Sequence, residues 1–196
     1  MINDERRELV HPVSTRAATD TAPAEIEGYA AVFNEETTIG GRHNAHAWRE
    51  QIAPGAFDGV DASDVVALLN HDPNLLLGRT GAGTLRLAVD DRGLRYTITP
   101  PDTTIGRDTL ALVQRGDLVG SSFGFIVDAD EWEAAADGLP RRTITRATVL
   151  DVSPVTFPAY PQTTVQSRDR CAGLVFAYAA DVRRRRLRLQ ELIARA

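Results

Sequence analysis

Residues 65–100 read VVALLNHDPNLLLGRTGAGTLRLAVDDRGLRYTITP and contain the clearest β-strand signals in the chain. The run from Val65 to Leu69 is continuously apolar and ends at a polar Asn-His-Asp-Pro sequence. Residues 84–100 then alternate apolar and polar side chains around Asp91-Arg92-Gly93, which is the pattern of a β-hairpin. This stretch predicts a fold built mainly from strands joined by tight turns.

The sequence on either side extends the same pattern. Residues 25–33 suit a strand in which Gly28 marks a bulge or a close approach, and residues 117–132 and 142–157 predict two further strands. Apolar residues at near-helical spacing predict one amphipathic helix over residues 103–115, ended by Gly116. We therefore expect an α+β fold, mainly an antiparallel, closed or partly closed β-barrel with a few flanking helices.

The chain divides into three parts by composition. Residues 1–23 are polar and predict a flexible N-terminal arm, residues 24–165 form one predicted domain, and residues 166–196 predict a linker and a C-terminal helix. Six arginines lie between Arg183 and Arg195, so this helix is basic. Within the domain, residues 34–49 have the composition of a long loop, which is typical of a lid or a binding loop. Ile52 and Phe57 follow it as apolar anchors.

Composition excludes several classes of protein. With 196 residues and 43% hydrophobic content, one domain can bury a sizeable core without a disulfide, and Cys171 has no partner for one. No apolar run approaches the roughly 20 residues of a spanning helix. The net charge of −5 argues against a general nucleic-acid binder. Because the chain has no Lys, Schiff-base and Ser–Lys chemistry are excluded.

Three residues could carry chemistry. His71 follows the apolar run at a predicted strand end, Ser122 lies in the small-residue segment GSSFGF, and Asp151 interrupts an apolar strand pattern. Together they have the side chains of a serine nucleophile, its general base and an orienting carboxylate. Each also has an ordinary structural interpretation, namely a half-buried histidine bonded to backbone, a strand serine packed against glycine and a surface aspartate.

His43 and His46 form an H-x-x-H pair in the predicted long loop. No cysteine or helical H-E-x-x-H context accompanies the pair, and a solvated loop explains it as well as a zinc site does. A metallohydrolase using His43, His46 and Asp72 is the corresponding alternative, and it predicts sensitivity to chelators. We expect no metal site.

Five segments of the chain carry a resemblance to a known family. They are EGYAAVFN (27–34), WREQIAPGAFDG (48–59), ALLNHDPNLLLGRT (67–80), RGDLVGSSFGF (115–125) and TVLDVSPVTFPAYP (148–161). In this order and at this spacing, they resemble the prohead, or head-maturation, serine proteases of tailed bacteriophages. The resemblance covers about residues 25–164, and it implies the fold of the herpesvirus assemblin proteases.

The resemblance implies roles for particular residues. The family's catalytic His corresponds to His71, and its nucleophile, directly before Phe-Gly-Phe, corresponds to Ser122. Asp151 is the implied third member, although relatives often have Glu there and assemblins use a second His, for which His43 and His46 are the alternatives. Backbone N–H groups from Ser122 to Gly124, including that of Phe123, are candidates for the oxyanion hole. Arg79 is a further candidate.

The resemblance also implies a function. It predicts a serine endopeptidase, without a cofactor, that cleaves the scaffolding segment of the major capsid protein or a separate scaffold, and also itself. The enzyme would act inside the procapsid in the host cytoplasm, or be encoded by a prophage. The portal protein and other copies of the chain are further partner candidates, whereas nucleic acid and membrane are not. Residues 161–170 are a candidate self-cleavage site, and the basic helix is a candidate tether. The alternative is a catalytically silent β-barrel that serves procapsid assembly.

Overall fold

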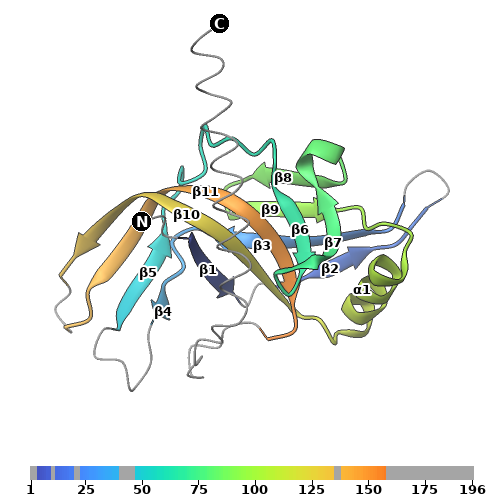
Figure 1. The fold of residues 1–196 in the computed structure, drawn as a ribbon. Helices are drawn as coiled ribbons and strands as arrows, with labels where there is room; N and C mark the ends of the chain where they lie inside the picture. Colours follow the sequence, from blue (N-terminus) through green and yellow to red (C-terminus); the bar gives the residue numbers. More distant parts are fainter. Residues whose placement is uncertain (1–3, 10–11, 20–22, 40–46, 135–137, 158–196) are drawn as a thin grey trace, which may run out of the picture.

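The computed structural model describes residues 4–9, 12–19, 23–39, 47–134 and 138–157 (Figure 1). These residues form eleven strands, one α-helix and one 3₁₀ turn. The elements are β1 (Asp4–Leu9), β2 (Ser14–Arg16), β3 (Glu25–Val32), β4 (Thr37–Ile39), β5 (Trp48–Ile52), β6 (Val66–Leu69), β7 (Asp72–Arg79), η1 (Thr80–Ala82), β8 (Leu85–Val89), β9 (Gly93–Ile98), α1 (Thr104–Arg115), β10 (Gly120–Glu133) and β11 (Arg141–Val155).

The strands form two sheets. The larger has seven strands in the order β1-β10-β11-β5-β4, with the β6–β7 hairpin attached to β11, and the smaller has the order β2-β3-β9-β8. This confirms a predominantly β fold of the α+β kind, with α1 as the single α-helix of the described residues. Neither sheet closes on itself within the described part of the chain, so the closed barrel is not confirmed.

The two longest strands, β10 and β11, are central in the larger sheet. They pair antiparallel over nearly their full lengths, with register shifts after Gly124, Val127 and Ala129. Such irregularities bend a strand and increase its twist, and Figure 1 shows both strands as long curved ribbons. One end of β11 pairs in parallel with β5 and the other with β6. The β6–β7 hairpin is thereby attached beside the C-terminal end of β11.

Most local predictions agree with the structure. The hairpin is β8–β9, the strand of residues 25–33 is β3, and the helix is α1, which ends at Gly116 in the left-handed conformation. Ile52 and Phe57 are buried, as expected of anchors. These elements have strong local patterns, which explains why the sequence alone predicts them.

Two stretches contain strands that the sequence analysis does not predict. The polar N-terminal stretch contributes β1 and β2, which pair with β10 and β3, and the long-loop stretch contributes β4 and the start of β5. These are short or edge strands. Their pairing depends on backbone hydrogen bonds to neighbouring strands rather than on an apolar period, so the sequence pattern is weak there.

The core lies between the two sheets. Phe123 and Phe125 of β10 stack with ring centroids 4.5 Å apart, and Phe57 meets Phe123 edge-on. Tyr96 and Ile26 of the smaller sheet are fully buried in the same cluster. Close-packed aromatic side chains therefore cover the core face of the strand that carries Ser122, which favours a single position for its backbone.

Gly28 on β3 lies against side chains of both sheets, Tyr96 of β9 and Ser121 of β10. A Cβ atom there would lie 2.5 Å from the Tyr96 hydroxyl and 2.7 Å from Ser121 Oγ. Both atoms are buried, so neither can move aside easily. We expect Gly28→Ala to lower the free energy of unfolding by about 1–3 kcal/mol, measured by urea denaturation. Gly81→Ala, whose nearest atom would be Ser63 O at 3.3 Å, is the matched control. Equal stability of the two variants would contradict the expectation.

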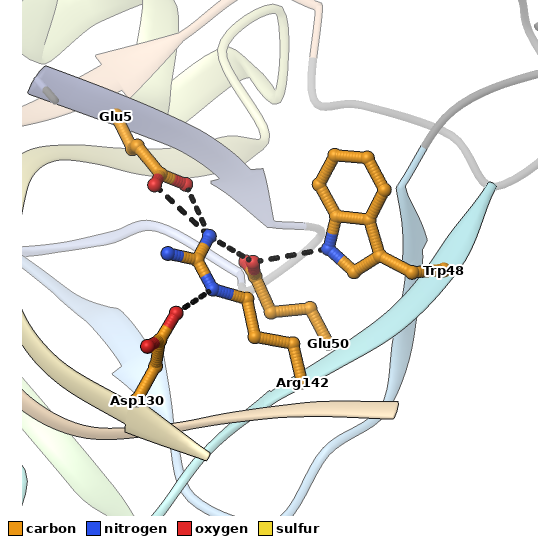
Figure 2. A network of polar contacts seen from close by, with 5 residues as sticks. All are labelled: Glu5, Trp48, Glu50, Asp130 and Arg142. Carbon is orange, nitrogen blue, oxygen red and sulfur yellow. Dashed lines mark hydrogen bonds and ion pairs between the residues drawn. The ribbon is translucent and has the colours of Figure 1, made fainter. Parts of the chain in front are cut away.

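Arg142, near the start of β11, links four strands of the larger sheet through hydrogen bonds (Figure 2). Its guanidinium donates to Glu5 of β1 at 2.8 and 2.9 Å, to Glu50 of β5 at 3.1 Å and to Asp130 of β10 at 2.6 Å. Trp48 Nε1 donates to Glu50 at 3.4 Å. The Arg142 side chain is largely buried, so the three carboxylates satisfy a charge that would otherwise be costly to bury. This network connects β1 to β10, β11 and β5.

Some predictions lie outside the described residues. These are His43 and His46, the candidate self-cleavage site and the basic C-terminal helix. In the described part of the chain, no helix has the length and apolar character needed to cross a membrane.

Candidate active site

Two adjacent serines of β10 point to opposite faces of the larger sheet. Ser121 faces the core, where its Oγ lies 2.7 Å from the Tyr96 hydroxyl. Burial raises the pKa of Tyr96, so this hydroxyl stays protonated and can hydrogen-bond with Ser121 as donor or acceptor. Because side chains alternate along a strand, Ser122 faces the other way. In the segment GSSFGF, Ser121 therefore packs in the core, whereas Ser122 can contact residues on the opposite face of the sheet.

Ser122 meets His71 and Asp151 on that second face. Ser122 Oγ lies 2.6 Å from His71 Nε2, and His71 Nδ1 lies 2.6 Å from Asp151 Oδ1. All three side chains are buried, with Ser122 fully so. The structure therefore brings together the three predicted residues from positions 51 and 80 residues apart along the chain.

A tight turn positions His71. Asn70 and His71 connect β6 to β7 and both have positive φ, 53° and 57°, as in the two-residue type I′ hairpin turn. Asn and His adopt this conformation more readily than most residues. The turn is fixed to the end of β11: Asn70 N–H donates to Pro154 O at 3.0 Å, and Thr156 N–H donates to Asn70 Oδ1 at 2.8 Å. The imidazole is thus held close to the strand that carries Asp151.

The register of β10 and β11 explains the placement of the acid. Ser122 pairs with Ser153, and Gly124 pairs with Asp151. Directly paired residues share a face of the sheet, and so do residues two apart on one strand. Ser122, Asp151 and Ser153 therefore lie on the same face, and Gly124 presents no side chain opposite the carboxylate. Asp151 is buried there, so the interpretation of a surface aspartate does not apply.

The hydrogen bonds are consistent with one tautomer of His71. A carboxylate is an acceptor, so Nδ1 carries the proton that is donated to Asp151, and the Nε2 lone pair is left to accept from the Ser122 hydroxyl. A hydroxyl bonded to a neutral imidazole nitrogen, with a carboxylate behind the ring, is an arrangement suited to nucleophilic attack on a carbonyl. In the described residues, no group of three or more acidic, His or Cys side chains is arranged to hold a metal.

The other predicted site residues lie in different surroundings. Phe123 is buried in the aromatic core, so only its backbone can face the Ser122 side of β10. Gly124 lies directly before the first register shift of β10. The guanidinium of Arg79, at the end of β7, donates to Asp64 at 2.7 Å on a half-exposed surface.

The sequence analysis misses one residue of this cluster, Ser153. Its Oγ donates to Asp151 Oδ1 at 2.9 Å and lies 3.3 Å from His71 Nδ1, and the side chain is fully buried. A signal was present in the sequence, because Ser153 stands two positions after Asp151 in the same predicted strand. Asn70 has the residue type of a turn, but its hydrogen bond with Thr156, 86 residues away, has no sequence signal.

No curated protein and no solved structure matched the chain. A family model described as caudovirus prohead serine protease matches residues 11–173, which is most of the chain and includes the residues that meet at Ser122. The protein belongs to the caudovirus prohead serine protease family.

Proposed function

We propose that the protein is a serine endopeptidase in which Ser122 is the nucleophile, His71 the general base and Asp151 the residue that orients the imidazole. One observation carries the proposal: the continuous hydrogen-bonded chain from Ser122 Oγ through both nitrogens of His71 to Asp151 Oδ1. Membership of the prohead serine protease family supports it independently.

The chemistry proceeds in two stages. Ser122 Oγ attacks the scissile carbonyl carbon while its proton passes to His71 Nε2, and the imidazolium that forms is stabilised by Asp151. The C–N bond then breaks as Nε2 returns the proton to the leaving amine, which leaves an acyl group on Ser122. A water molecule, deprotonated by the same nitrogen, releases the acid product and restores the enzyme.

The oxyanion of the tetrahedral intermediate needs donors near Ser122. The predicted donors are the backbone N–H groups of Phe123 and Gly124, which point to opposite edges of β10, so one oxyanion can use only one of them. We propose Gly124, because the register shift directly after it interrupts the ladder with β11. Arg79 is a weaker assignment, since its guanidinium would first have to leave Asp64.

The family points to the substrates. We propose that the enzyme cleaves the scaffolding segment of the capsid protein, or a separate scaffold, inside the procapsid, and that it also processes itself. Self-association and contact with the portal protein belong to the same proposal. The domain responsible would span about residues 24–165, within the matched range.

One observation favours the second candidate, a catalytically silent assembly module: Ser122 is fully buried. A substrate carbonyl cannot reach Oγ in this closed arrangement, so an enzyme would need the site to open, whereas an assembly module would not.

Co-expression with a candidate capsid-protein substrate separates the two candidates. For an endopeptidase, we expect defined capsid or scaffold fragments by mass spectrometry, together with a single acyl adduct on Ser122 after treatment with a serine-directed acylating reagent. The labelling should be repeated at high protein concentration, because self-association can open a closed site. An intact capsid protein and an unlabelled Ser122 under both conditions would favour the silent module.

A further inference from the structure

Ser153 lies against the hydrogen bond that joins His71 to Asp151. Its Oγ is within reach of both bonded atoms, 2.9 Å from Asp151 Oδ1 and 3.3 Å from His71 Nδ1. A serine hydroxyl has one proton to donate and lone pairs with which to accept. Because a carboxylate can only accept, the Ser153 proton goes to Asp151 and an Oγ lone pair faces the Nδ1–H group.

We infer that Ser153 is a positioning residue for the proposed reaction: it fixes the carboxylate of Asp151 and the protonated Nδ1 of His71, so that Nε2 presents its lone pair to Ser122. The inference rests on the proposed function for its catalytic consequence. The arrangement of the three side chains, however, can be measured without any substrate.

The fold holds Ser153 in place more firmly than a surface residue would be held. It pairs directly with Ser122 in the β10–β11 register, and its side chain has no exposed surface. Pro154 follows it, with a fixed φ and a carbonyl that accepts from Asn70 of the His71 turn. The same stretch of β11 thus contacts the nucleophile's strand, the acid and the turn that carries the base.

Water cannot readily replace the Ser153 hydroxyl. Changing Ser to Ala removes one oxygen atom, which leaves less than the roughly 30 Å³ that a water molecule occupies in the liquid. Asp151 Oδ1 would then lose a donor in a buried site, where a hydrogen bond to a charged group matters most. We expect the carboxylate, and with it the imidazole, to become less well ordered.

The test compares Ser153→Ala, Ser153→Thr and Ser121→Ala in the full chain. For Ser153→Ala, we expect kcat on a cleaved peptide to fall about tenfold to a hundredfold with KM nearly unchanged. The threonine variant keeps a hydroxyl and should return kcat toward wild type. Ser121→Ala removes an equally buried hydroxyl that bonds to Tyr96, so it controls for stability and should keep the wild-type kcat.

Nuclear magnetic resonance of the His71 Nδ1 proton gives a readout that needs no activity. Ser153→Ala should shift this resonance, while Ser121→Ala should leave it unchanged. If Ser153→Ala changes only the melting temperature, with the resonance and kcat as in wild type, Ser153 is merely structural and the inference is overturned. A shifted resonance in a protein that cleaves nothing would instead support the positioning of His71 and count against the proposed function.

Discussion

Replacing Ser122 by Ala is expected to slow cleavage of the proposed capsid-protein substrate by about 10⁴- to 10⁶-fold. The variant loses the only atom that can form the acyl intermediate, and the hydrogen-bonded chain through His71 to Asp151 has nothing left to activate. Binding of the peptide should persist, because the substitution removes a single oxygen atom. The measurement is single-turnover cleavage of a capsid-derived peptide, followed by mass spectrometry.

Ser121→Ala is a matched control for this variant. The two serines are neighbours on β10 and are both fully buried, yet Ser121 faces Tyr96 on the core side. Its replacement should lower the melting temperature, because the Tyr96 hydroxyl loses a buried partner, but leave kcat within a few-fold of wild type. Wild-type cleavage by Ser122→Ala would refute the assignment. Loss of activity only in Ser121→Ala would show that the two serines had been assigned to the wrong faces.

The parts of the fold that the sequence predicts are those with local patterns. The alternation around Asp91-Arg92-Gly93 predicts β8–β9, and helical spacing with Gly116 predicts α1. β1 and β4 follow no such pattern, because their stability comes from backbone pairing with strands that are distant in sequence. The number and order of strands in each sheet are likewise non-local, so whether the sheets close into a barrel could not be decided from periodicity.

The candidate site shows the same division. The sequence identifies His71, Ser122 and Asp151 as chemically suitable, but their meeting depends on the parallel pairing of β6 with β11 and on the positive φ of the Asn70–His71 turn. Neither can be seen as a residue pattern. Ser153 was within reach of sequence reasoning, since Asp151 and Ser153 are two apart on one strand and must share a face. The contact of Ser153 with the imidazole of His71, however, depends on the position of the His71 turn, which is non-local.

Asp151→Asn is expected to lower kcat by about 10⁴-fold at neutral pH, as the loss of an orienting carboxylate does in other serine proteases. The amide matches the carboxylate in shape, so the fold should be kept. However, its NH₂ group can donate to Nδ1, which stabilises the tautomer that has its proton on Nε2. That tautomer has no lone pair for the Ser122 hydroxyl. Peptide cleavage gives kcat, and ¹⁵N resonances of the His71 ring report the tautomer.

Combining Asp151→Asn with Ser153→Ala tests whether the two residues act through the same imidazole. If Ser153 works by fixing Asp151, its removal should cost little once the carboxylate is absent, so the double variant should be about as slow as Asp151→Asn alone. Independent contributions would instead multiply, and the double variant would be a further tenfold to hundredfold slower. Comparing Asp151→Asn, Ser153→Ala and the double variant in one assay therefore tests whether Ser153 acts through Asp151.

The single variant also tests the acid itself. An Asp151→Asn enzyme within tenfold of wild type, with the same ring tautomer, would exclude Asp151 as the orienting acid.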